Sequence, residues 1–354
     1  MKMLSIVGAR PQFVKAAPVG RALDRAGITE VLLHTGQHYD PEMSGVFFKE
    51  LGIRHPHYNL EVGSGSHAAQ TAAMLVGIEE VLLKEHPAFV LIYGDTNSTL
   101  AGAIAASKLH IPVAHVEAGL RSFNRAMPEE INRVVADALS TLLFAPTDVA
   151  ARNLKREGMS DGVHIVGDVM YDAVLWAAER VGSGAPEIVT RLGLTPGEYL
   201  LATVHRASNT DDPANLAAIA AALSSAGETV VFPVHPRTRK AIATSGIVMG
   251  GNVMGIEPVS YLDMIALEKH ARAILTDSGG VQKEALWLGV PCVTLRDETE
   301  WVETVELGWN ALAGTDTASI LAALRRPPPH GAPPQPYGDG HAAERIAEIL
   351  RQHA

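Results

Sequence analysis

The chain has 354 residues, a length that favours two domains over one. Hydrophobic residues make up 47% of the sequence, which is enough for two buried cores and too much for a disordered protein. The 29 basic and 39 acidic residues give a net charge of -10, which excludes general nucleic-acid binding because that function needs a basic surface.

Short apolar runs rich in β-branched residues alternate with Ala- and Leu-rich helical stretches along the whole chain. The predicted strands form two series, residues 3–7, 31–34, 90–93, 113–116 and 142–144, then residues 200–204, 230–234, 253–256, 273–276 and 292–295. Continuous apolar strands separated by helices are typical of parallel sheets covered on both faces. The sequence therefore predicts an α/β fold of two doubly wound, Rossmann-like domains.

The boundary between the predicted domains lies near Gly167, after the apolar run 163–166. Prolines between 327 and 336 end a helix and predict a loop. Beyond them, residues 342–350 have the pattern of a short amphipathic helix. We expect residues 1–167 to form the first domain, 168–335 the second, and 336–354 a terminal segment.

The single cysteine, Cys292, cannot form an internal disulfide, which fits a reducing compartment. No signal peptide precedes the strand-like run at the start, and no apolar stretch is long enough to span a bilayer. We therefore expect a cytoplasmic protein that does not enter a membrane.

Polar and charged residues follow nearly every predicted strand. These segments are Gly8-Ala9-Arg10-Pro11, Gly94-Asp95-Thr96, Glu117-Ala118-Gly119, His205-Arg206, His235-Pro236-Arg237 and Asp277-Ser278-Gly279-Gly280. Open parallel α/β sheets bind ligands beyond the carboxyl ends of their strands. Two facing domains would place all these segments in one cleft.

A nucleotide site is predicted at the turn Ser278-Gly279-Gly280, which precedes the predicted helix 281–288. Backbone N–H groups at a helix start bind phosphate oxygens, and glycine lets a phosphate approach closely. Glu284, within the first two turns, is placed to accept hydrogen bonds from ribose hydroxyls. The alternative is a turn that only starts the helix, with Glu284 complementing the helix dipole.

The first strand is followed by Gly8-Ala9-Arg10-Pro11-Gln12-Phe13, which is not the dinucleotide fingerprint G-x-G-x-x-G. We therefore expect no NAD. The scattered histidines lack the spacing of a metal site, so we expect no metal either. Arg10 and Lys15 offer positive charge for phosphate recognition, with solvated surface as the alternative for each.

Three carboxylates indicate acid–base chemistry. Asp95 and Glu117 follow strands that are consecutive in sequence, and such strands are usually adjacent in space. Glu129 lies in the first turn of a predicted helix. The alternatives are a capping role for Asp95 and a dipole-complementing role for Glu129. His205 and His235 are further candidates, with capping or core hydrogen bonding as the alternative.

Six motifs together resemble the non-hydrolysing UDP-N-acetylglucosamine 2-epimerases. They are Gly8-Ala9-Arg10-Pro11, Gly94-Asp95-Thr96, His115-Val116-Glu117-Ala118-Gly119-Leu120-Arg121, Pro128-Glu129-Glu130-Ile131-Asn132-Arg133, Asp277-Ser278-Gly279-Gly280-Val281-Gln282 and Pro336-Tyr337-Gly338-Asp339-Gly340. They follow the order of the family along nearly the whole chain. The resemblance implies the GT-B architecture, in which two Rossmann-like domains face each other across a cleft and the C-terminal helix crosses back to the first. It also implies a homodimer.

The resemblance assigns acid–base roles to Asp95, Glu117 and Glu129, with Arg133 as a companion on the helix of Glu129. It assigns to His205 the role of an essential histidine near the diphosphate. It also assigns diphosphate contacts to Arg10, Ser278, Gly279 and Gly280, ribose binding to Glu284, and a possible allosteric site to Gln37 and His38. It implies reversible conversion of UDP-N-acetylglucosamine to UDP-N-acetylmannosamine. The proton on C2 is not acidic, so UDP is eliminated to give 2-acetamidoglucal and then added back. That path needs a base, an acid on the opposite face and stabilisation of the leaving diphosphate.

Five positions depart from the commonest family pattern, namely Gln12, Tyr39, Ser208, Trp301 and Val302. The runs 8–15 and 36–40 and the variant at Trp301 resemble the branch that includes epimerases of UDP-2,3-diacetamido-2,3-dideoxyglucuronate, which is the alternative substrate. A retaining GT-B glycosyltransferase, a non-catalytic UDP-sugar sensor and a hydrolysing epimerase remain as alternative functions.

Overall fold

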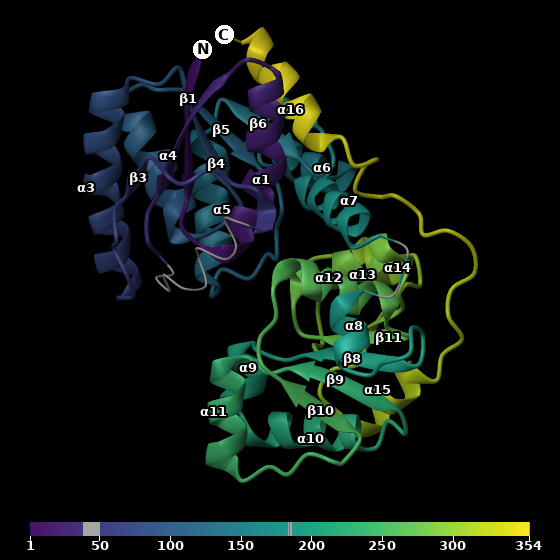
Figure 1. Cartoon of the computed structure of the whole chain (residues 1–354). Coiled ribbons are helices and arrows are strands. Elements are labelled where there is room, and N and C mark those ends of the chain that lie inside the picture. The colour runs from purple at the N-terminus through teal and green to yellow at the C-terminus, as the bar shows by residue number, and fades with distance from the viewer. Residues whose placement is uncertain (38–49, 183, 185, 354) are drawn as a thin grey trace. The chain divides into compact units, whose positions relative to one another are not determined.

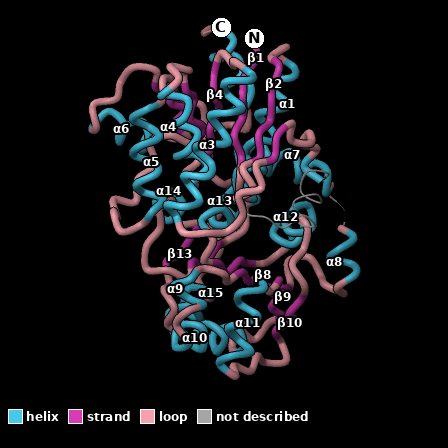
Figure 2. Tube along the Cα trace, turned by 90° about the vertical axis from the view of Figure 1, so that its left-hand side faces the viewer, coloured by secondary structure: helices cyan, strands magenta, loops and turns pink. Residues whose placement is uncertain are grey.

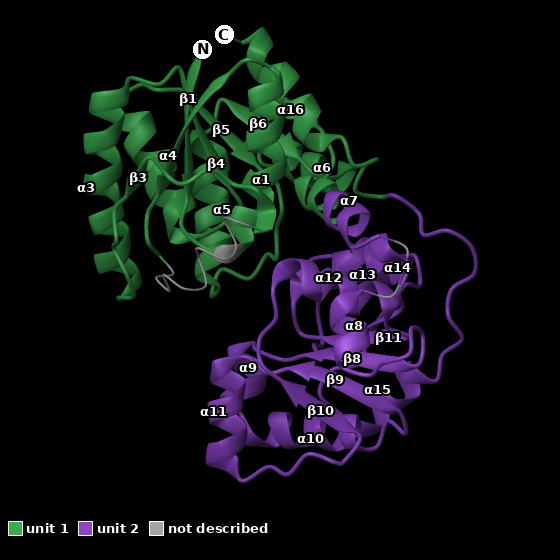
Figure 3. Cartoon of the chain, viewed as in Figure 1, with its two compact units in different colours: residues 1–175, 336–354 green, residues 176–335 purple. Residues whose placement is uncertain are grey.

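The computed structural model describes residues 1–37, 50–182, 184 and 186–353, and the chain divides into two compact units (Figure 3). Unit 1 comprises Met1–Leu175 and Pro336–Ala354, and unit 2 comprises Trp176–Gln335. The described residues of each unit form a parallel sheet with helices, which confirms the prediction of two Rossmann-like folds. None of the described helices has the length and apolar character needed to cross a membrane.

The sheet of unit 1 has the strand order β3-β2-β1-β4-β5-β6-β7, with every pair parallel. Its strands are β1 (Lys2–Val7), β2 (Thr29–His34), β3 (Tyr58–Asn59), β4 (Phe89–Tyr93), β5 (Val113–Val116), β6 (Leu142–Ala145) and β7 (Val163–Ile165). Its helices are α1 (Arg10–Arg25), α3 (His67–Glu85), α4 (Asn97–Lys108), α5 (Pro128–Leu139), α6 (Asp148–Arg156) and α16 (Ala342–Gln352), and α7 (Val169–Val181) runs from unit 1 into unit 2 (Figure 1).

Helix α4 packs closely against the centre of this sheet. At Gly102 an added Cβ would lie 2.8 Å from a methyl of Ile6 and 3.0 Å from one of Ile92, so only glycine permits this approach. Thr96 is the N-cap, and its hydroxyl accepts from the Thr99 backbone N–H. The helix start is therefore fixed directly after the end of β4.

The C-terminal segment belongs to unit 1. Its helix α16 lies beside α1, with an ion pair between Arg25 and Glu344, and the amino terminus and the end of α16 lie at the same edge of the unit (Figures 1 and 2). The Asp172 carboxylate on α7 accepts from the first backbone N–H groups of α16, those of Ala342 and Ala343, at 3.2 and 2.7 Å. This capping fixes the start of α16 on α7.

The sheet of unit 2 has the order β10-β9-β8-β11-β12-β13, again all parallel. Its strands are β8 (Tyr199–Thr203), β9 (Thr229–Pro233), β10 (Val253–Ile256), β11 (Ala273–Thr276), β12 (Cys292–Thr294) and β13 (Asn310–Leu312). Its helices are α8 (Glu187–Arg191), α9 (Ala207–Thr210), α10 (Pro213–Ser224), α11 (Pro236–Ser245), α12 (Tyr261–His270), α13 (Gly279–Leu288), α14 (Val302–Glu306) and α15 (Thr317–Leu324).

Each sheet has one switch point, where the strand order reverses. In unit 1 it lies between β1 and β4, and in unit 2 between β8 and β11. Ligands of open α/β sheets bind in the crevice beyond the strands at such points. The residues that follow β1, β4, β8 and β11 are therefore candidates for ligand binding.

Candidate active site

At the switch point of unit 1, the segment after β1 is tied to the end of β4. The amide oxygen of Gln12 accepts from the backbone N–H groups of Gly8 and Ala9, at 2.7 and 3.1 Å. Its amide nitrogen donates to the Tyr93 carbonyl at 2.8 Å. Gly8 is packed so tightly that a Cβ would overlap the hydroxyl of Ser98. Hydrogen bonds and close packing therefore hold the segment after β1 against the end of β4.

Lys15 and Glu117 form a buried ion pair at this edge. Burial lowers the pKa of the Lys15 ammonium, but the attraction of Glu117, and then of Asp95, outweighs burial and raises the pKa. The backbone of Glu117 has φ +72°, in the left-handed region that costs a residue with a Cβ about 1–3 kcal/mol. Strain held at a buried carboxylate is a hallmark of functional sites.

A second ion pair lies after β4. The guanidinium of Arg133 on α5 donates to the Asp95 carboxylate at 2.6 and 2.9 Å, and also to Glu130 at 2.9 Å. Asn132 donates to the Asp95 carbonyl at 2.9 Å. Burial opposes ionisation of Glu130, but hydrogen bonds from Ser122 and Arg133 lower its pKa. Asp95 is thus held by α5 while its side chain stays 31% exposed.

Glu129 takes a different direction from its neighbour. Its side chain is exposed, whereas Glu130 is 2% exposed, because consecutive residues on a helix point about 100° apart.

Gln37 accepts from the backbone N–H and the hydroxyl of Ser98, at 3.1 and 2.7 Å. His38 and the side chain of Arg10 lie outside the described residues. Roles for these two therefore stay predictions.

At the switch point of unit 2, His205 follows β8, and His235 follows the neighbouring strand β9. The centroids of the two rings are 6.0 Å apart. The fully buried Asp277 accepts from the backbone N–H groups of His205 and Arg206, at 3.0 and 2.9 Å. The Nδ1 atom of His205 also lies 3.4 Å from an Asp277 oxygen. Asp277 therefore fixes the loop and turns a 43% exposed imidazole outward.

Ser278 occupies the N-cap position of helix α13 without a capping hydrogen bond from its side chain. Gly279 and Gly280 lie in the first turn, so the helix starts two residues earlier than predicted. The Ser278 backbone N–H donates to the hydroxyl of Thr276 at 2.9 Å. The first-turn backbone N–H groups have no partner within the helix itself, which is the arrangement that binds phosphate oxygens.

Gly279 is also required by packing. An added Cβ would lie 2.7 Å from a Glu300 oxygen and 2.9 Å from the Trp301 indole nitrogen. Glu300 accepts from Arg206 at 3.3 Å and pairs with Arg296 at 3.0 Å. Burial opposes ionisation of Glu300, but the two arginines lower its pKa. The turn at residues 278–280 is therefore bordered by one carboxylate and two guanidinium groups.

Glu284 on α13 is 6% exposed and neighbours the fully buried Glu268 on α12. Burial, and then the Glu284 carboxylate, raise the pKa of Glu268 well above its usual range. The two side chains are also hydrogen-bonded to each other. An ionised Glu284 accepts hydrogen bonds, as ribose recognition requires.

Sequence reasoning gave no role to several residues that the structure brings into these clusters. The side chains of Gln12, Glu130 and Asp277 accept hydrogen bonds from backbone N–H groups of nearby loops. Such contacts produce no recognisable spacing in the sequence. Glu268 and Glu300 come from segments outside the six motifs. A buried carboxylate in an apolar helix, as at Glu268, is the one signal that the sequence offered.

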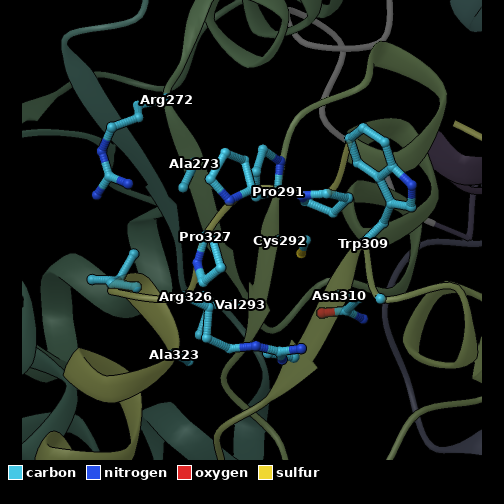
Figure 4. A pocket seen from close by; sticks show the side chains of 15 residues that line it. Arg272, Ala273, Pro291, Cys292, Val293, Trp309, Asn310, Ala323, Arg326 and Pro327 are labelled. Atoms are coloured by element: carbon cyan, nitrogen blue, oxygen red, sulfur yellow. The ribbon is translucent and has the colours of Figure 1, made fainter. Parts of the chain in front are cut away.

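Among the described residues no cluster of His, Cys, Asp and Glu side chains has the geometry to hold a metal ion. A pocket of about 150 Å³ opens in unit 2 beside Cys292, where Arg272, Pro291 and Trp309 precede β11, β12 and β13 (Figure 4). It lies at the amino ends of these strands. It is therefore separate from the candidate site at their carboxyl ends.

Comparison with known proteins agrees with this geometry. Residues 21–351 match the sequence model of the family described as UDP-N-acetylglucosamine 2-epimerase. A UDP-N-acetylglucosamine 2-epimerase homolog from Methanococcus maripaludis is 53% identical over 356 residues, covering 99% of each chain. The UDP-2,3-diacetamido-2,3-dideoxy-D-glucuronate 2-epimerase of Pseudomonas aeruginosa is 50% identical over 360 residues, again covering 99% of each.

The fold is shared with a solved relative. The crystal structure of UDP-GlcNAc 2-epimerase from Methanocaldococcus jannaschii, in complex with UDP-GlcNAc and UDP, is 44% identical to this chain. It matches with a TM-score of 0.91 over 99% of this chain and 100% of its own. The sequence motifs, the two Rossmann-like units and these matches agree, and the chain belongs to the UDP-N-acetylglucosamine 2-epimerase family.

Proposed function

We propose that this enzyme inverts C2 of UDP-N-acetylglucosamine to give UDP-N-acetylmannosamine, by elimination and re-addition of UDP. The observation that carries the proposal is the pair of cation-held carboxylates at the ends of neighbouring strands, Asp95 with Arg133 after β4 and Glu117 with Lys15 after β5. Two carboxylates held at one site edge supply what inversion at one carbon needs, a base and an acid.

The proposed reaction balances in two steps. A carboxylate removes the C2 proton as the bond from C1 to the diphosphate oxygen breaks, and the products are 2-acetamidoglucal and UDP. A proton then adds to C2 from the opposite face while the diphosphate oxygen bonds C1 again. The exposed Glu129 joins the strand-end pair as the third acid–base candidate of unit 1.

Unit 2 is proposed to hold the nucleotide. The first turn of α13, with Ser278, Gly279 and Gly280, supplies backbone N–H groups for the diphosphate, and Glu284 accepts from the ribose hydroxyls. His205 lies beside Asp277 at the switch point and His235 follows the neighbouring strand β9, and a donor at this place stabilises the charge that develops on leaving UDP. Arg10 and Lys15 of unit 1 are proposed to add positive charge.

A second substrate has specific support. The named UDP-2,3-diacetamido-2,3-dideoxy-D-glucuronate 2-epimerase is 50% identical to this chain, whereas the named UDP-N-acetylglucosamine 2-epimerases of the two methanogens are 44% and 45% identical. The segment around Trp301, which borders Gly279, carries one of the departures from the commonest family pattern. The same elimination chemistry would act on either sugar, because the substituents at C3 and C6 do not react.

Proton NMR with each UDP-sugar in deuterated water tests the function and the substrate together. An epimerase brings the preferred sugar to an equilibrium mixture and incorporates deuterium at C2. Release of free N-acetylmannosamine would instead indicate a hydrolysing enzyme. Absence of C2 exchange with both sugars would leave a glycosyltransferase or a UDP-sugar sensor as the function.

We also propose that the enzyme works without NAD or a metal, as a cytoplasmic homodimer whose activity responds to UDP-N-acetylglucosamine near Gln37 and His38. The missing dinucleotide fingerprint supports the first point, and the family resemblance supports the dimer and the regulation. Loss of activity on dialysis against chelator, with recovery on adding a divalent ion or NAD, would contradict the first point. Light scattering tests the dimer.

A further inference from the structure

His115 lies on β5 with no solvent exposure, two residues before Glu117. Its Nε2 atom is 2.7 Å from the carbonyl oxygen of Gly94, and its Nδ1 atom is 2.7 Å from a carboxylate oxygen of Asp137 on α5. Both distances are those of strong hydrogen bonds. One imidazole therefore bridges the end of β4 and helix α5.

Both partners of the ring are acceptors. A backbone carbonyl has no proton to donate, so Nε2 must donate to Gly94. The other Asp137 oxygen is paired with the guanidinium of Arg121, so Asp137 is a carboxylate and accepts at Nδ1. A ring that donates from both nitrogens carries two protons and a positive charge.

The surrounding charges balance such a cation. The second Asp137 oxygen accepts from the Gly119 backbone N–H at 3.1 Å and pairs with Arg121 at 2.7 Å. Arg121 in turn donates to Glu157 at 2.8 and 2.7 Å. The network thus contains two cations and two carboxylates, and a buried charge that is paired and hydrogen-bonded in this way is tolerated.

The hydrogen bonds of this network reach the backbone close to both candidate acids. Gly94 immediately precedes Asp95, and Gly119 follows Glu117 by two residues. Gly94 also lies against the Lys15–Glu117 ion pair, since an added Cβ would be 3.0 Å from the Lys15 nitrogen. A displacement at His115 would therefore reach both acids at once.

We infer that His115 is a buried imidazolium that acts as a positioning residue, holding the ends of β4 and β5 so that Asp95 and Glu117 keep their catalytic placement. The kinetic consequence rests on the proposed epimerase function. The protonation of the ring does not depend on that function and can be tested separately.

The first experiment is nitrogen-15 NMR of the full-length protein labelled at histidine, titrated from acidic to alkaline pH. The His115 ring should show two protonated nitrogens, with slowly exchanging protons, at neutral pH. Burial lowers the pKa of His164 on β7, so that ring provides an internal reference for the neutral form. A His115 ring with one unprotonated nitrogen at neutral pH would overturn the inference.

The second experiment compares His115→Gln with His164→Gln, a matched substitution on another strand of the same sheet. Gln can donate to Gly94 or to Asp137 but cannot bridge both at once. His115→Gln should lower kcat about tenfold or more, the scale expected when reacting groups move by a fraction of an ångström. UDP affinity should not change, and His164→Gln should resemble the unaltered enzyme in both respects.

A purely structural role would lower the melting temperature of His115→Gln without lowering kcat per folded molecule, and that result would contradict positioning. If His115→Gln does not fold, the ring is assigned by through-bond correlation to its own backbone and the NMR titration decides alone. If the unaltered enzyme converts neither UDP-sugar, the proposed function fails while the NMR result still stands or falls by itself.

Discussion

The ammonium group of Lys15 and the carboxylate of Glu117 form an ion pair in which the side chains are only 9% and 7% exposed. Truncating one partner leaves the other buried and unpaired. Lys15→Met should therefore lower the free energy of unfolding by about 3–5 kcal/mol and sharply lower kcat. Denaturant unfolding and initial rates measure the two effects.

A double variant provides the control for this prediction. In Lys15→Met/Glu117→Gln neither side chain is charged, so the double variant should be more stable than Lys15→Met alone. Strictly additive losses of stability would contradict a direct ion pair. A loss of UDP affinity in Lys15→Met would instead support the diphosphate contact predicted from sequence.

Two adjacent glutamates should respond differently to the same substitution. Glu129→Gln alters an exposed side chain and should cut kcat about a hundredfold, as should Asp95→Asn and Glu117→Gln, with little loss of stability at Glu129. Glu130→Gln removes a charge from the Ser122–Arg133 network and should lower the melting temperature. Equal effects of the two substitutions on both quantities would contradict this division.

Much of the fold follows from sequence pattern, since all ten predicted strands occur within one or two residues of their predicted bounds. The strands β3, β7 and β13 were not among the predicted strands, because two or three residues are too few to give a period. Of the residues predicted at strand ends, Asp95, His205 and Ser278 follow strands next to a reversal of order, whereas Glu117 follows β5, the neighbour of β4.

The contacts within each cluster could not be predicted in the same way. The pairing of Lys15 with Glu117 joins residues 102 apart in sequence, and that of His205 with Asp277 joins residues 72 apart. Such pairs depend on strand register and on side-chain direction, which a single sequence does not encode as a spacing. The left-handed backbone of Glu117 is equally invisible, since its residue type favours other regions.

Glu284 should matter for nucleotide affinity rather than for turnover. Glu284→Ala removes the proposed ribose acceptor and should weaken UDP binding, measured by calorimetry, while kcat at saturation changes little. Glu268→Gln is the matched control, because it keeps a hydrogen-bond donor beside Glu284 and adds no charge. Unchanged UDP affinity in Glu284→Ala would refute the ribose assignment.

Asp172 should make the stability of unit 1 fall as pH rises. Burial raises the pKa of its carboxyl to about 6 from an ordinary 3.8, although the backbone N–H groups of Ala343 and Ala342 oppose the shift. A carboxyl whose pKa is raised by folding stabilises the protein most below its unfolded pKa. That contribution is lost as pH rises through about 6.

The raised pKa of Asp172 corresponds to a loss of folding free energy on the order of 2–3 kcal/mol between pH 4 and pH 7. Asp172→Asn, which cannot ionise, should remove this slope from urea unfolding curves measured across that range. Asp339→Asn is the control of opposite sign, because hydrogen bonds from Arg345 lower the pKa of Asp339, whose contribution is lost as pH falls. If Asp172→Asn keeps the slope of the unaltered protein, folding does not raise the pKa of Asp172.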